Sequence, residues 1–282
     1  MITAKIIADS LNADTGSRLT TFLVRFHRFI LPEVLTHRVF SRNTSSSRAI
    51  PVAKKIALIA ECLASPVSFG LAAKPMYSVE ENDKGIYIKE FNDTFAPIDA
   101  WRLAAESAVE FATAFSNSDY HKQVVNRIIE PYTWTDMVIS STEWDNFFKL
   151  RISSDAQPEI QELAVKMKLA LLESTPVELQ EGEWHLPFVT DSERNEFSLN
   201  QQKQLSVVRC ARVSYKTKLD EDYDYSKDLQ LFTLLRDSGH FSPFEHVAEL
   251  SHFDNEEYLT NFKGFVQYRS YVEEALNYEN NN

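Results

Sequence analysis

Two kinds of apolar pattern alternate along the chain and restrict it to folds that combine helices with a sheet. Residues 19–30 are rich in β-branched and aromatic side chains, which predicts a strand. Residues 97–117 and 157–173 instead carry apolar side chains at the spacing of one helical face. No internal repeat or long linker divides residues 1–282. We therefore expect an α+β fold, a single mixed domain that is rich in helix and has a central antiparallel or mixed sheet.

The other segments predict further helices joined by irregular connections. Pro32 and Pro51 stand where two of these helices would begin. Helices are expected over residues 32–43, 51–63, 120–129, 142–151, 226–237 and 255–277, and short strands at residues 86–88 and 205–214. The rest of residues 64–95 and 174–203 is rich in turn-forming and polar residues and predicts irregular structure.

The composition excludes several classes of protein. The formal net charge is −12, and such a surface repels the phosphate backbone of nucleic acids. No apolar run is long enough to cross a membrane, and the N-terminus lacks the pattern of a secretory signal. Cys62 and Cys210 lie far apart without the spacing of metal ligands, so buried thiols are expected. We expect a cytoplasmic protein without a nucleic-acid, membrane or metal partner.

Positive charge is nevertheless concentrated in one short window. Arg38, Arg42 and Arg48 surround a run of four hydroxyl residues, 44–47. Hydroxyls and loop N–H groups bond phosphate oxygens, and arginine supplies a planar fork of donors. The pattern therefore fits a site for one phosphate group. A solvated, serine-rich loop with surface arginines fits the same spacing, and the residues alone leave both interpretations open.

The same window resembles the signature of flavin-dependent thymidylate synthases. That signature is Arg-His-Arg, followed after seven residues by serine and two places later by arginine. The residues that match it here are His37, Arg38, Ser41, Asn43, Ser46 and Arg48. Thr36 and Thr44 stand where the family has arginine and glutamate. The flanking residues 19–38 are also similar to the strand and helix that lead into the signature.

Two further blocks, residues 121–173 and 205–246, extend this resemblance beyond the signature block 19–48. The matching residues of the first are Arg127, Asn146, Leu150, Arg151, Ala156, Gln157, Glu159 and Ile160, and those of the second are 211–215 and 239–246. Asp155 stands where the family commonly has histidine. In the family the second block precedes the signature, whereas here it follows it. We therefore expect a circular permutation, which is tolerated where termini lie close together at the surface.

The resemblance implies a homotetramer with shared active sites that methylates dUMP to dTMP. FAD would be the cofactor, with NADPH and methylenetetrahydrofolate as co-substrates. The implied ligands of the dUMP phosphate are Ser45, Ser46, Ser47, Arg48 and, from a neighbouring subunit, Arg127. The implied FAD contacts are His37, Arg38, Asn43, Asn146, His240 and Ser242. Arg151 would be the catalytic residue, facing the uracil ring and favouring its deprotonated form.

Two other functions remain open. The departures at Thr36, Thr44 and Asp155 allow a related enzyme with a different reaction, such as a dUMP hydroxymethylase, or one that modifies another pyrimidine nucleotide. A non-catalytic nucleotide-binding protein of the same fold is the other alternative. The implied synthase needs no activated cysteine, because in this family the flavin carries the chemistry.

Overall fold

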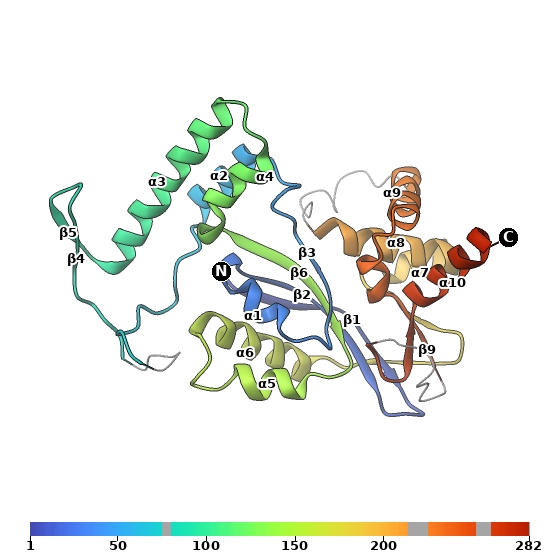
Figure 1. Cartoon of the computed structure of the whole chain (residues 1–282). Helices are drawn as coiled ribbons and strands as arrows, with labels where there is room; N and C mark the ends of the chain where they lie inside the picture. Colours follow the sequence, from blue (N-terminus) through green and yellow to red (C-terminus); the bar gives the residue numbers. More distant parts are fainter. Residues whose placement is uncertain (75–79, 214–224, 252–260, 282) are drawn as a thin grey trace.

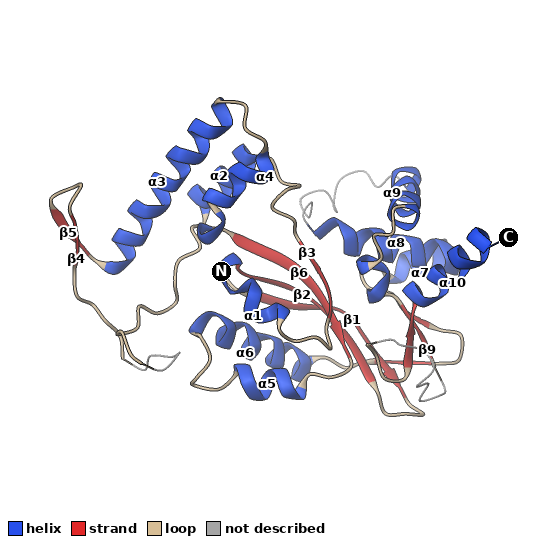
Figure 2. Ribbon diagram, viewed as in Figure 1, coloured by secondary structure: helices blue, strands red, loops and turns tan. Residues whose placement is uncertain are grey.

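A five-stranded sheet forms the centre of the computed structural model, which describes residues 1–74, 80–213, 225–251 and 261–281 (Figures 1 and 2). In spatial order its strands are β3 (Ser41–Thr44), β6 (Trp134–Ser141), β2 (Arg18–His27), β1 (Thr3–Asn12) and β7 (Val177–Leu179). Neighbours are antiparallel except β7, which is parallel to β1. The sheet is therefore mixed, and the expected α+β class is confirmed.

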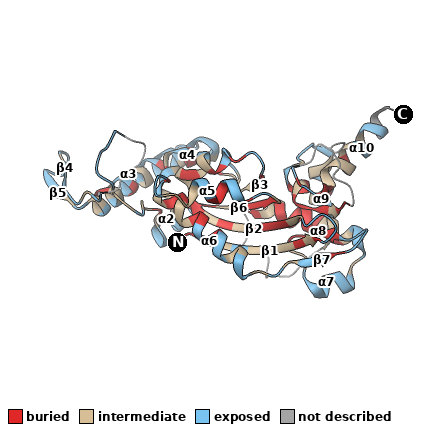
Figure 3. Cartoon of the chain, turned by 90° about the horizontal axis from the view of Figure 1, so that it is seen from below, coloured by how far each residue is buried: buried red, intermediate tan, exposed pale blue. Residues whose placement is uncertain are grey.

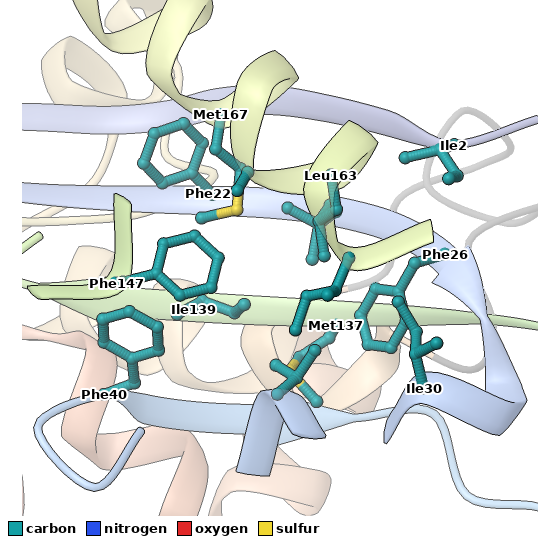
Figure 4. Packing of buried hydrophobic residues seen from close by; sticks show 14 of the residues in the cluster. Ile2, Phe22, Phe26, Ile30, Phe40, Met137, Ile139, Phe147, Leu163 and Met167 are labelled. Carbon is teal, nitrogen blue, oxygen red and sulfur yellow. The ribbon is translucent and has the colours of Figure 1, made fainter. Parts of the chain in front are cut away.

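One face of the sheet carries the largest apolar core. Helices α5 (Asp145–Arg151) and α6 (Pro158–Glu173) lie over this face, together with the short helix α1 (Leu31–Leu35) that follows the 3-10 helix η1 (Arg28–Ile30) (Figure 1). Figure 4 shows side chains of β2 and β6 meeting those of α6, and the labelled ones include Phe22, Phe26, Met137, Ile139, Leu163 and Met167. Burial of this apolar surface holds α6 on the sheet.

The opposite face is covered by the C-terminal third of the chain. Helix α8 (Leu199–Ala211) and the 3-10 helix η4 (Ser242–His246) pack there beside a small sheet. The strands of that sheet, in spatial order, are β10 (Phe265–Gln267), β9 (Ala248–Leu250) and β8 (Trp184–His185). The surrounding helices are α7 (Asp191–Glu196), α9 (Tyr225–Asp237) and α10 (Tyr268–Asn281). Because both faces of the central sheet are covered, residues on both sides of β2 and β6 are buried (Figure 3).

A third group of helices lies at one end of the sheet. Helices α2 (Val52–Glu61), α3 (Pro97–Asn117) and α4 (Lys122–Ile128) pack on one another, and the 3-10 helix η2 (Glu130–Tyr132) connects α4 to β6. The hairpin of β4 (Ile86–Ile88) and β5 (Asp93–Phe95) extends beyond α3, away from the central sheet (Figures 1 and 3). None of the helices within the described residues combines the length and apolar composition needed to cross a membrane.

Several expectations from sequence are wrong in their type of structure. The strand expected at 205–214 lies instead in α8 as far as Ala211, because Ser198 N–H donates to Gln201 Oε1 at 3.0 Å and begins a helix there. The helix expected over 32–43 ends at Leu35, and β3 then pairs with β6. Residue 214, the end of the expected strand, lies outside the described residues, as do residues 255–260, the start of the expected last helix. Residues 265–267 of that expected helix form β10.

The described part of the block 205–246 packs against the signature. Helix α8 contacts η4, and η4 in turn lies against β3. The N-terminus lies beside the central sheet, whereas α10 extends to the edge of the molecule (Figures 1 and 3). The permuted order itself stays a prediction from sequence, as does the single domain over 1–282.

Candidate functional site

The signature residues are divided between the two ends of β3. His37 lies before this strand, and the hydroxyl run Ser45–Ser47 follows it. A strand of four residues spans roughly 13 Å, so the two groups form separate clusters within one chain. Pairing of β3 with β6 brings residues after β6 to the first cluster and residues before β6 to the second.

The first cluster centres on Arg151, the last residue of α5. Its Nε donates to His37 Nε2 at 2.9 Å, and its Nη2 donates to Thr36 Oγ1 at 3.2 Å. His37 stacks on Phe40 and meets the ring of Phe147 edge to face. Burial and then the charges of Arg151 and Arg42 lower the pKa of His37 to about 4, so its ring is neutral near pH 7. Both groups that Arg151 contacts here are thus uncharged, and its positive charge is retained.

Thr36, which stands where the resemblance expects arginine, takes part in this cluster. Its hydroxyl accepts a hydrogen bond from Arg151, which an arginine side chain could not do. Thr44, which stands where the resemblance expects glutamate, makes no such contact. Its Oγ1 is buried and has no hydrogen-bond partner within the described part of the chain.

Asn43 joins the signature to the third block. Its Nδ2 donates to the Cys210 carbonyl at 2.5 Å, and its Oδ1 accepts from Ser242 Oγ at 3.2 Å. Nearby, Gln267 Nε2 donates to Ser41 Oγ at 2.8 Å. The structure therefore brings together Asn43 and Ser242, which the resemblance assigns to the same cofactor although they are 199 positions apart.

The second cluster centres on the carboxylate of Glu130, at the start of η2. Arg127 Nη1 donates to both of its oxygens, at 3.0 and 2.7 Å. Arg28 Nη2 lies 3.1 Å from Glu130 Oε1, to which Ser47 Oγ also donates a hydrogen bond. Burial opposes the charge of Glu130, but the hydrogen bonds from Ser47 and Arg127 and the charge of Arg28 outweigh it, so its pKa is lowered.

Lys55 enters this cluster from α2. Its Nζ donates to Ser47 Oγ at 3.1 Å, and its side chain is almost completely buried. Burial lowers the pKa of Lys55 to about 8, against the attraction of Glu130 and with the repulsion of Arg28 and Arg127. The ammonium group is therefore mostly charged at pH 7, in a place that costs free energy without an anion nearby.

The loop that carries the hydroxyls is held by its backbone. Asn126 Nδ2 donates to the carbonyls of Ser47 and Ile50, at 2.6 and 2.9 Å. Ser45 N–H donates to the Asp136 carbonyl at 2.9 Å, which continues the pairing with β6. These bonds fix the loop so that the Ser47 hydroxyl faces Glu130 and Lys55.

The second cluster contains some of the residues that the sequence predicts for the site and some that it does not. Ser47 and Arg127 share Glu130 within one chain, so this contact needs no second subunit. Arg28, Lys55 and Glu130 are not predicted. A signal existed for Lys55, because it falls on the apolar face of α2 with Val52 and Ile59. The two other residues carry no such signal, since only the fold brings them to Ser47.

Four of the remaining assigned residues lie on the surface, whereas the Ser45 side chain is buried and Ser46 is partly buried. Arg38, Arg48, Asn146 and His240 are exposed, and His240 bonds within its own turn, to Ser238 Oγ at 2.8 Å.

The expectation of two buried thiols holds for one of the two cysteines. Cys210 is fully buried, which raises its pKa above the usual range. Cys62 is exposed, because it caps the end of α2 at the surface.

A chain of buried hydrogen bonds connects β1, β2 and β6 of the central sheet with β8 and η4. It runs from Ser10 through His185, Thr21 and Ser140 to His246, with distances of 2.8, 2.7, 2.5 and 2.8 Å. All five side chains are buried. Burial lowers the pKa of both histidines to about 3, so both rings are neutral. His246 Nε2 is buried without a hydrogen-bond partner among the described residues.

Comparison with known proteins gives one family match and several solved structures of low similarity. The family model described as "Thymidylate synthase complementing protein" matches residues 19–177, more than half of the chain. No curated protein sequence matches. Among solved structures, the UMP/dUMP methylase PolB from Streptomyces cacaoi bound with 5-Br UMP is 16% identical, with 61% of this chain and 89% of that chain covered and a TM-score of 0.45.

Two further solved structures give similar values. The same methylase bound with 5-Br dUMP is 15% identical over 61% of this chain and 91% of that chain, with a TM-score of 0.45. Thymidylate synthase X from Helicobacter pylori with FAD and dUMP is 20% identical over 54% of this chain and 67% of that chain, with a TM-score of 0.37. The family match includes both clusters at the ends of β3. This match, and not the likeness to the solved structures, shows to which family the chain belongs.

Proposed function

Because the chain belongs to the thymidylate synthase complementing protein family, we propose that it is a flavin-dependent thymidylate synthase that converts dUMP to dTMP. The observation that carries this proposal is the convergence of Ser47 and Arg127, two of the assigned phosphate ligands, on one carboxylate. Donors that already surround an anion are suited to a phosphate group. A hydroxyl, two guanidinium groups and an ammonium group provide them in one place.

Arg151 is proposed to act on the uracil ring. Its guanidinium is oriented by neutral partners, His37 and Thr36, so its charge is available to a ligand. A cation beside N3 of uracil stabilises the deprotonated ring and makes it richer in electrons. A neutral His37 is needed for this arrangement, because a protonated ring could not accept the hydrogen bond from Arg151 Nε.

FAD fits the chemistry of the donors that the resemblance assigns to it. Arg38, His240 and Asn146 are exposed and provide charged and neutral donors, while Asn43 and Ser242 hold each other in place. When bound, FAD would supply the hydride for reduction of the transferred carbon. NADPH and methylenetetrahydrofolate are proposed as co-substrates, the first as reductant and the second as carbon donor.

The separation of the two clusters supports active sites completed by a second copy of the chain. Arg151 and Ser47 lie beyond opposite ends of β3 in one chain. A homotetramer with shared sites, as the resemblance implies, could place the phosphate cluster of one subunit near Arg151 of another. Sedimentation of the purified protein with and without dUMP measures this assembly.

A direct assay tests the proposed reaction. Purified protein is mixed with dUMP, methylenetetrahydrofolate, FAD and NADPH, and dTMP is the expected product. Mass spectrometry of the nucleotides distinguishes it from a hydroxymethylated product, which the substitutions at Thr36 and Thr44 make the second candidate. Absence of any modified pyrimidine nucleotide, from dUMP or UMP, would contradict both.

The proposed phosphate site predicts a pH dependence of dUMP affinity. The pKa of Lys55 is about 8, so its ammonium charge is present below that pH and lost above it. A phosphate monoester is already dianionic there and adds no titration of its own. We expect dUMP affinity to fall roughly tenfold as pH rises from 7 to 9, below the range in which N3 of uracil ionises, since one charge-assisted contact is lost.

The control for this dependence is the neighbouring lysine. A Lys55→Met variant should bind dUMP weakly and show a flat profile over this range. A Lys54→Met variant, changed at an exposed position of the same helix, should keep the parent profile. Equilibrium dialysis at each pH makes the comparison. The charged groups that shift the pKa of Lys55 are Glu130, Arg28 and Arg127. Arg25 and Cys62 line the small cavity beside Lys55. If Lys55→Met kept the pH profile of the parent, the titration would belong to another group.

A further inference from the structure

The Glu130 carboxylate holds the donors that a phosphate group would need. Ser47 donates its hydroxyl proton to this carboxylate, and Arg127 directs a guanidinium nitrogen to both of its oxygens. A hydroxyl has a single proton to donate, so Ser47 cannot serve Glu130 and a phosphate oxygen at once. A ligand that accepts the Ser47 proton must therefore take this hydrogen bond from Glu130.

We infer that Glu130 is an internal anion that occupies the phosphate site and that a phosphate monoester displaces it. This inference rests on the proposed function for the identity of the ligand. It assigns Arg28 and Lys55 to the same site, because both surround the same Ser47 and Glu130 oxygens. The ligand class is a phosphate monoester, with the nucleotide dUMP as the proposed member.

The charges around the site favour an exchange of anions. Glu130 faces two guanidinium groups, and Lys55 lies one hydrogen bond further away. One carboxylate leaves most of this positive charge unbalanced, although Arg28 and Lys55 are largely buried. A dianionic phosphate with three acceptor oxygens balances more charge and satisfies more donors than a carboxylate does.

Glu130 also has a way out of the site. Its side chain is 18% exposed, and its partner Arg127 is 56% exposed. The carboxylate can therefore turn towards solvent without crossing the apolar core. In the absence of ligand it returns and limits the repulsion between Arg28, Lys55 and Arg127. The measured affinity for phosphate then reflects the difference between two free energies, that of phosphate and that of the Glu130 carboxylate bound to the same donors.

The test is a Glu130→Gln variant. Glutamine keeps the shape and can still accept from Ser47, but it removes the competing charge. We expect the affinity for dUMP and for inorganic phosphate to increase roughly ten- to a hundredfold, as measured by isothermal titration calorimetry. Affinity for deoxyuridine, which has no phosphate, should not change. A Glu130→Asp variant, with a shorter reach and the charge retained, should give a smaller increase and serves if the glutamine variant does not fold.

Glu193→Gln is the matched control. Glu193 also binds an arginine, Arg209, and its side chain is 16% exposed, close to the 18% of Glu130. The substitution changes the net charge equally but lies on α7, outside the cluster. It should leave phosphate affinity unchanged. An equal increase in both variants would show an effect of net charge alone and overturn the inference.

The outcomes separate this inference from the proposed function. If the parent forms dTMP but Glu130→Gln binds dUMP no more tightly, Glu130 is not a competitor and the inference is overturned while the function stands. If inorganic phosphate binds more tightly to Glu130→Gln but no variant binds dUMP, the anion site stands and the nucleotide function fails. If neither protein binds phosphate or dUMP, both are overturned.

Discussion

Replacing Arg151 with alanine is expected to lower the rate of dUMP methylation roughly 100- to 1000-fold. Removal of one preorganised electrostatic contact to a reacting group typically has an effect of this size. Arg151 is held by Nε to His37 and by Nη2 to Thr36, both uncharged, so its charge can act on a bound ring. The measurement is the steady-state rate of dTMP formation with saturating cofactors.

A matched truncation separates this effect from loss of a surface charge. Arg102→Ala removes a guanidinium that is 56% exposed on α3 and pairs with Asp99. Its rate should equal that of the parent. Thr36→Val should lie between the two, because Arg151 keeps its contact with His37 and loses only the one with Thr36. A folded Arg151→Ala protein with a rate within twofold of the parent would remove Arg151 from the proposed chemistry.

Replacing Thr21 with valine is expected to lower the free energy of unfolding by about 2–6 kcal/mol. Thr21 Oγ1 connects Ser140 Oγ to His185 Nε2 in the centre of the sheet. Valine has nearly the same shape but no hydroxyl, so one buried group on each side loses its partner. Each such loss costs about 1–3 kcal/mol where water cannot enter. Urea unfolding, followed by circular dichroism, measures the change.

Thr113→Val is the control for this substitution. Thr113 has the same side chain on the exposed surface of α3 and donates to the Val109 carbonyl at 2.8 Å. Water can replace that bond, so the change should be within about 0.5 kcal/mol. If Thr21→Val were as stable as Thr113→Val, the chain of hydrogen bonds from Ser10 to His246 would contribute little to the fold.

The same chain couples the two buried histidines. Each ring is neutral and carries one proton, on Nδ1 or Nε2. If Ser10 donates to His185 Nδ1, each following group donates onward, and the proton of His246 lies on Nε2. The opposite direction places both protons on Nδ1. The tautomer of His185 is thus linked to that of His246 through Thr21 and Ser140.

Elements defined by local periodicity are those that sequence reasoning places well. The helix expected over residues 97–117 is α3 with the same bounds, and the helix expected over 157–173 is α6. Strands β1 and β6 are missed, although they lie beside β2 in the centre of the sheet. Residues on both faces of β6 are buried, so its sequence does not alternate between polar and apolar residues.

The residues of the candidate site also fall into those that the sequence predicts and those that it misses. Family motifs predict His37, Ser47, Arg127 and Arg151 as functional residues, and the fold gives each of them a specific partner. The residues that match the family motifs do not include Arg28, Lys55 or Glu130. These charges come from η1, α2 and η2, and they meet only because β2, β3 and β6 pair side by side.

The order of residues therefore settles the family, the class of fold and the main helices, because helical spacing and short motifs involve residues that are near one another in the chain. It does not settle which charges face one another. That depends on pairings such as those of Ser47 with Glu130 and Asn43 with Ser242, 83 and 199 positions apart. Contacts over such separations arise from packing of the whole domain, and they decide whether the proposed phosphate site holds a carboxylate when no ligand is bound.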